Sequence, residues 1–146
     1  MLSTPSAIER RPFLPTTSPP AQLAGFEIEH AVQRMLGRPE LWWEAVGLFI
    51  QHFADWESQW QASRGDAVAE GKCVHALRSA AANVGANHLA CVAAVLEELL
   101  VKAAGNTAPA AIPPSLRFHL QDCFRAVWRT ATDAFFGPHG YPTPRC

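Results

Sequence analysis

The strongest constraint on the fold is a stripe of large apolar side chains that recur every three or four residues between positions 42 and 60. The stripe consists of Trp42, Val46, Phe49, Phe53, Trp56 and Trp60. Side chains at this spacing share one face of an α-helix, which has 3.6 residues per turn. The stripe therefore predicts a long amphipathic helix, with Pro39 in its first turn, whose aromatic face points into a helical core.

Helical spacing of apolar residues continues on both sides of this stripe. A short helix is expected at residues 27–36, and longer helices from the N-cap Asp66 to Val84, from the N-cap Asn87 onward, and over residues 116–135. The apolar positions of the short helix are Ile28, Val32, Met35 and Leu36. No segment alternates with the period of two that a strand requires. The sequence predicts an all-α fold, namely an antiparallel four-helix bundle preceded by a short N-terminal helix.

Composition favours one domain with a sizeable core, because 49% of the 146 residues are apolar. Prolines crowd residues 1–24, which are expected to form a disordered tail before a helical domain at 25–136 and a C-terminal tail at 137–146. The net charge is −1, whereas a nucleic-acid binder has an excess of basic residues, so the composition does not indicate nucleic-acid binding. No apolar run has the length of a membrane span or the layout of a signal peptide, so we expect a cytoplasmic protein that is a monomer.

One histidine in the third expected helix, His75, combines exposure with positive charge. Residues one turn away on either side are Gly71 and Ser79, and Lys72 and Arg78 flank it three residues away. The small residue Ala82 lies on the same face. Apolar residues fall on the opposite side of the helix: Cys73, Val74, Leu77, Ala80, Ala81 and Val84. This helical projection, with about 3.6 residues per turn, predicts that His75 faces away from the core.

These residues suit an imidazole that carries a phosphoryl group. A phosphoryl acceptor needs a nucleophilic nitrogen, an open approach and positive charge to hold the phosphoryl oxygens. Lys72 and Arg78 are expected to stabilise the phosphoryl group, while Gly71, Ser79 and Ala82 offer a surface on which another protein can dock.

Residues 75–86, which read HALRSAAANVGA, resemble the motif of the histidine phosphotransfer (HPt) domain family of bacterial two-component phosphorelays, commonly H-x-L-K-G-S-[SAG]-[GA]-N-[LIV]-G-A. The similarity extends over roughly residues 25–103, including a downstream Leu96-Glu97 pair. The resemblance implies a four-helix bundle with His75 as phosphoacceptor and no kinase activity. It implies no cofactor of its own, with Mg²⁺ brought by the partner, and partners that are response-regulator receiver domains and a hybrid sensor histidine kinase.

Three positions depart from that motif. Arg78 replaces a lysine, Ser79 replaces a glycine that allows close approach of a receiver, and Ala80 replaces a serine. They keep open an alternative function: a degenerate HPt-like module that docks a receiver or kinase without phosphotransfer.

A second alternative is a metal site. Two pairs of potential ligands have a spacing that places both side chains on one face of a helix: His88 with Cys91, and His119 with Cys123. Together these four residues could bind zinc. This spacing is loose beside an established zinc motif, and small thiols also pack well in helical cores. The sequence therefore predicts no metal site.

Overall fold

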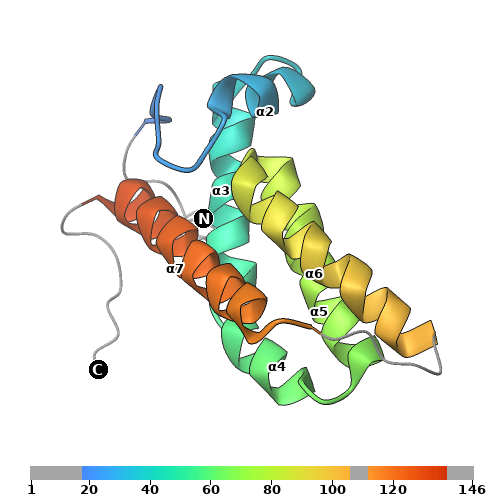
Figure 1. Cartoon of the computed structure of the whole chain (residues 1–146). Coiled ribbons are helices and arrows are strands. Elements are labelled where there is room, and N and C mark those ends of the chain that lie inside the picture. Colours follow the sequence, from blue (N-terminus) through green and yellow to red (C-terminus); the bar gives the residue numbers. More distant parts are fainter. Residues whose placement is uncertain (1–17, 106–111, 138–146) are drawn as a thin grey trace, which may run out of the picture.

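Six helices make up the regular structure of the computed structural model, which describes residues 18–105 and 112–137 (Figure 1). They are α2 (Ile28–Arg34), α3 (Pro39–His52), α4 (Trp56–Ser63), α5 (Ala67–Val84), α6 (Asn87–Gly105) and α7 (Pro114–Phe136). Within these ranges there is no strand beyond an isolated bridge between Leu23 and Phe26. The all-helical fold that the sequence predicts is confirmed.

The aromatic stripe is buried as predicted, but it lies on two helices instead of one. All six of its side chains belong to the core. The expected single helix is split at residues 53–55, so that α4 leaves the direction of α3 (Figure 1). Neither glycine nor proline marks this turn. Its physical cause lies in tertiary contacts, because α4 is hydrogen-bonded to the first half of α5 and the chain must turn to follow it.

Tryptophans of the stripe hold α5 in place through their indole N–H groups. Trp42 Nε1 donates to the backbone oxygen of Val84 at 2.8 Å, and Trp56 Nε1 donates to that of Cys73 at 2.8 Å. Buried indole N–H groups need such acceptors. The stripe therefore provides apolar contact and also fixes the position of the helix that carries His75.

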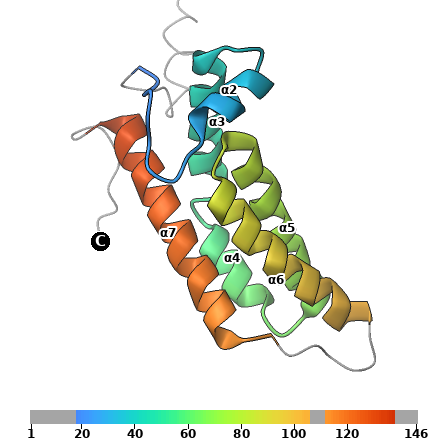
Figure 2. The same cartoon turned by 45° about the horizontal axis from the view of Figure 1, so that its top comes forward.

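The ends of α5 agree with the sequence prediction. The side chain of Asp66 accepts hydrogen bonds from the backbone of Val68 and Ala69, as an N-cap does. Gly85 ends the helix in the left-handed conformation, with φ +88°. The next helix begins at Asn87, and its first backbone hydrogen bond runs from the N–H of Ala90 to the oxygen of Ala86. The N-cap position is therefore occupied by Ala86, and the prediction of Asn87 as N-cap is wrong. This short turn sends α6 back along α5 (Figure 2).

The short helix α2 ends earlier than predicted. The N–H groups of Met35 and Gly37 both bond to the oxygen of Val32, which closes the helix in a turn. Leu36 takes a left-handed φ of +63° and is 82% exposed. Leu36 was therefore wrongly placed on the apolar face, and Ala31 is the buried residue of α2.

The predicted domain has one hydrophobic core, and its edges can be followed only in part. Leu23 is partly buried against that core, so packing begins before residue 25. The tail predictions for residues 1–17 and 138–146 lie outside the described residues. Among the described helices, none has the length and apolar character needed to cross a membrane.

Two helical glycines give a matched test of packing. A Cβ on Gly47 would lie 2.6 Å from Cζ of Phe135, a fully buried ring that packs against Trp43. A Cβ on Gly71 would meet only Cβ of Leu100, at 3.9 Å. Gly47→Ala should therefore lower the free energy of unfolding by about 1–3 kcal/mol. Gly71→Ala should leave it unchanged or raise it by up to about 1 kcal/mol, because alanine favours helix.

Urea unfolding of both variants checks this prediction. A Gly47→Ala protein as stable as the wild type would show that the core around Phe135 has room that the structure does not contain.

Candidate functional site

His75 lies in the middle of α5 with its side chain 60% exposed. The opposite face of the helix is buried through Val74, Leu77, Ala81 and Val84. Periodicity thus placed the imidazole on the correct side of the helix. Cys73 and Ala80, which the projection also assigned to the apolar side, are only partly buried.

A carboxylate from the neighbouring helix holds the imidazole. Oε2 of Glu97, on α6, lies 2.7 Å from Nδ1 of His75, and Oε1 of Glu97 accepts a hydrogen bond from Nη1 of Arg78 at 2.8 Å. The Glu97 side chain is only 15% exposed. Burial raises the pKa of Glu97, but the hydrogen bonds and charges of Arg78 and His75 outweigh burial and hold this pKa below its ordinary value.

This arrangement decides which nitrogen of His75 is available. An ionised carboxylate only accepts hydrogen bonds, so Nδ1 must carry the proton that faces Glu97. In the neutral imidazole with this tautomer, the second nitrogen, Nε2, has a free lone pair. Glu97 is a site residue that sequence reasoning missed, since a Leu-Glu pair in α6 gives no sign of its partner.

The two predicted phosphate-binding cations differ in their surroundings. Lys72 is exposed, borders the same groove as His75, and forms no ion pair with any described residue. Arg78 has one amino group held by Glu97, and its side chain is 49% exposed. Its remaining N–H donors stay available, because a guanidinium has five. Lys72 thus places a charge beside His75 that no described carboxylate holds, whereas Glu97 orients the charge of Arg78.

A groove of about 600 Å³ runs between α5 and α6 beside the imidazole. His75, Lys72 and Glu97 border it, and Gly71 lines its wall. Its apolar lining includes Val68, Ala76, Leu100, Val101 and Ala104. Val68 and Val101 expose more than half of their surface, which is unusual for valine and marks a surface suited to contact with another protein.

The other two predicted docking residues lie outside this groove. Ser79 and Ala82 are exposed on α5, on the C-terminal side of His75. The backbone oxygen of Ala82 accepts a hydrogen bond from Nη2 of Arg34 at 2.6 Å, which ties α2 to this end of α5. The predicted surface is therefore continuous along the exposed side of α5, with its hollow part on the Gly71 side.

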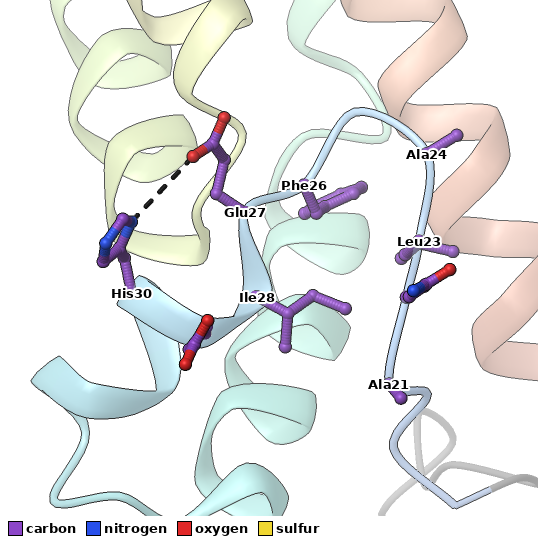
Figure 3. Close-up of a pocket in the computed structure, with 9 residues that line it drawn as sticks. Ala21, Leu23, Ala24, Phe26, Glu27, Ile28 and His30 are labelled. Carbon is purple, nitrogen blue, oxygen red and sulfur yellow. Dashed lines mark ion pairs between the residues drawn. The ribbon is translucent and has the colours of Figure 1, made fainter.

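A second hollow, shown in Figure 3, is lined among the described residues by residues 21–24 and 26–30. Its ion pair joins Nδ1 of His30 to Oε1 of Glu27 at 3.9 Å, between two largely exposed side chains. Such a solvent-exposed ion pair is weak and does not hold the His30 and Glu27 side chains in one orientation. The described residues of this hollow therefore form no organised reactive centre.

The metal ligands that the sequence considered are only partly brought together. His88, His119 and Cys123 form one group, in which the ligand atoms all lie within 4.8 Å of one another. Cys91 is exposed and does not belong to it.

A buried ion pair supports the start of α5, next to the groove. Glu70 is 1% exposed, and its carboxylate accepts two hydrogen bonds from Arg117 on α7, at 2.8 and 2.7 Å, and one from Trp60 at 2.9 Å. Burial raises the pKa of Glu70. The hydrogen bonds from Arg117 and Trp60 and the charge of Arg117 lower it by a larger amount, so this pKa lies below its ordinary value. This pair was not predicted from the sequence.

Lowered carboxyl pKa values make the fold sensitive to acid. Hydrogen bonds from Arg125 lower the pKa of Glu57, and the pKa values of Glu70 and Glu97 are also below the ordinary 4.5. A carboxyl whose pKa is lower in the folded state contributes its full stability above the unfolded pKa. It loses that contribution as the pH falls through the folded pKa. Stability should therefore decline progressively below about pH 5.

Urea midpoints measured from neutral pH down to about pH 3 test this. Glu57→Gln should be less stable than wild type at neutral pH and should lose less stability on acidification. Parallel pH curves for the two proteins would contradict the account of Glu57.

Comparison with protein-family models, with curated proteins and with solved structures found no match to this chain.

Proposed function

We propose that this chain is a histidine phosphotransfer protein, which relays a phosphoryl group between receiver-domain aspartates through a phosphohistidine on His75. The observation that carries the proposal is the bond between Nδ1 of His75 and Glu97, which leaves Nε2 as the free nucleophile on an exposed helix face. The resemblance of residues 75–86 to the phosphotransfer motif supports the same function.

The transfer step forms one bond and breaks one. The lone pair of Nε2 attacks the phosphorus of an aspartyl phosphate, the bond between phosphorus and the carboxyl oxygen breaks, and the aspartate leaves as a carboxylate. The imidazole ring gains positive charge as the bond forms. Glu97 stabilises that charge through the proton on Nδ1, which it holds or accepts. Reversal of the step delivers the phosphoryl group to a second receiver.

The cations beside His75 have distinct roles in this proposal. Lys72 forms no ion pair with a described residue, so its ammonium group is free to contact the phosphoryl oxygens. Arg78 shares Glu97 with His75, so its guanidinium is already oriented beside the imidazole and can donate further hydrogen bonds. Both charges favour a group that carries a charge of about −2.

The groove between α5 and α6 provides the docking surface. Its exposed valines, Val68 and Val101, would contact the apolar surface of a receiver, and Gly71 leaves the approach to His75 open. The receiver would bring the aspartate and its Mg²⁺, since Glu97 is already bonded to two side chains of this site. A carrier of this kind has no kinase activity and works in the cytoplasm, where receivers and hybrid sensor kinases exchange phosphoryl groups.

Incubation with a radiolabelled phospho-receiver and Mg²⁺ tests the function. The chain should acquire a label that is labile in acid and stable in base, and His75→Gln should acquire none. His30→Gln, which changes an exposed histidine on α2, is the matched control and should label normally. Equal labelling of His75→Gln and wild type would refute the assignment.

The docking-only alternative has specific observations in its favour: Arg78 is partly occupied by Glu97, and Ser79 adds a side chain one turn from His75. It predicts tight receiver binding without transfer, and restored transfer in the double variant Arg78→Lys with Ser79→Gly. Transfer by the wild-type chain would exclude this alternative.

A further inference from the structure

A cluster of nitrogen and sulfur ligands joins α6 to α7, away from the groove beside His75. It consists of His88 near the start of α6, and His119 and Cys123 one turn apart on α7. The rings of the two histidines meet edge to face, with centroids 5.7 Å apart. Sγ of Cys123 lies 3.7 Å from Nε2 and 4.0 Å from Nδ1 of His119. Residues far apart in the sequence thus present three metal-ligating atoms to one point.

The spacing of these atoms fits a tetrahedral metal centre. Zinc binds imidazole nitrogen at about 2.0–2.1 Å and thiolate sulfur at about 2.3 Å, so two such ligands at a tetrahedral angle lie about 3.5 Å apart. The distance of 3.7 Å between Cys123 and His119 is close to this value. All three ligand atoms lie within 4.8 Å of one another, and the exposed His88 ring is not enclosed by the core.

The type of ligand narrows the choice of metal. Imidazole and thiolate together favour zinc over the hard cations Mg²⁺ and Ca²⁺, which prefer oxygen. Three protein ligands with a solvent-exposed fourth position are typical of zinc sites that keep a water molecule. Both histidines are exposed, so an ion can enter without unfolding the bundle.

We infer that His88, His119 and Cys123 form a Zn²⁺ site that clamps α6 to α7. The two helices pack against each other, and an ion bound by residues of both would restrain their separation. A ligand that binds the folded state alone stabilises it by mass action. The sequence did not predict this site because the three residues belong to two pairs of loose spacing, and only the packing of α6 against α7 shows which members converge.

Zn²⁺ titration of the full chain, purified without a histidine tag, tests the site. Competition with a chromophoric chelator should give one Zn²⁺ per chain, and Co²⁺ should give the charge-transfer absorption of a cobalt–thiolate bond. Changes to residues that only support metal ligands already lower affinity by about 10–100-fold, so loss of a ligand should cost at least about 100-fold. His88→Ala and His119→Ala replace exposed side chains, so both proteins should fold.

Cys91→Ser is the matched control, since Cys91 is an exposed thiol one turn from His88 and lies outside the cluster. It should keep wild-type affinity and the cobalt–thiolate band, whereas Cys123→Ser should lose the band. Zn²⁺ should raise the melting temperature of wild type and not that of His88→Ala. Absence of stoichiometric Zn²⁺, equal affinity in His88→Ala, or loss of binding in Cys91→Ser would overturn the inference. None of these outcomes depends on phosphotransfer by His75.

Discussion

Arg117→Leu should lower the free energy of unfolding by about 3–5 kcal/mol, because it leaves the carboxylate of Glu70 buried without its charge partner. Glu70 is 1% exposed, and among the described side chains Trp60 would remain its one hydrogen-bond donor, with the charge of Arg64 acting without a hydrogen bond. Urea unfolding monitored by tryptophan fluorescence measures the loss.

A double variant separates the charge from the packing. In Glu70→Gln with Arg117→Leu, both charges are gone and the amide oxygen can still accept the hydrogen bond from Trp60, so part of the lost stability should return. If Arg117→Leu alone costs less than about 1 kcal/mol, the pair is solvated in the protein and the account of this buried network is wrong.

Glu97→Ala should slow phosphotransfer to His75 by about 100-fold or more, since it removes the group that fixes the proton on Nδ1 and balances charge on the ring. Receiver affinity should change much less, because the groove keeps its apolar lining. Glu97→Gln should lie between the two proteins, as its amide oxygen still accepts the Nδ1 proton but carries no charge. Single-turnover transfer from a phospho-receiver gives these rates.

The neighbouring residue offers a matched control. Glu98 is largely exposed and pairs with Lys102 in the same helix, so Glu98→Ala should transfer at the wild-type rate. Equal rates for Glu97→Ala and wild type would mean that the bond to Nδ1 does not activate His75. Equal losses in both variants would point to a general effect of charge on receiver docking.

The sequence was most informative where a property depends on one helix alone. The exposed side of α5, its N-cap at Asp66 and its end at Gly85 all follow from periodicity and local capping chemistry, and the structure confirms them. Burial of the aromatic stripe was predictable for the same reason. The break between α3 and α4 was not predictable, because it depends on the hydrogen bonds that Trp56 and Trp60 donate to α5.

Features that require two helices could not be predicted from spacing. Glu97 approaches His75 only because α6 folds back along α5, and the two residues are 22 positions apart. The same limit applies to Glu70 with Arg117, which pair across 47 positions. For each of these, the chemistry of the single residue is visible in the sequence, but its partner is set by packing.

The ring nitrogen of His75 that carries the phosphoryl group can be identified by NMR. The chain, labelled with ¹⁵N-histidine and phosphorylated by a receiver, can be studied by long-range ¹H–¹⁵N correlation spectroscopy, which distinguishes the two ring nitrogens. The account predicts a phosphoryl group on Nε2 of His75, because Nδ1 is bonded to Glu97. A phosphoryl group on Nδ1 of His75, or on any other histidine, would contradict it.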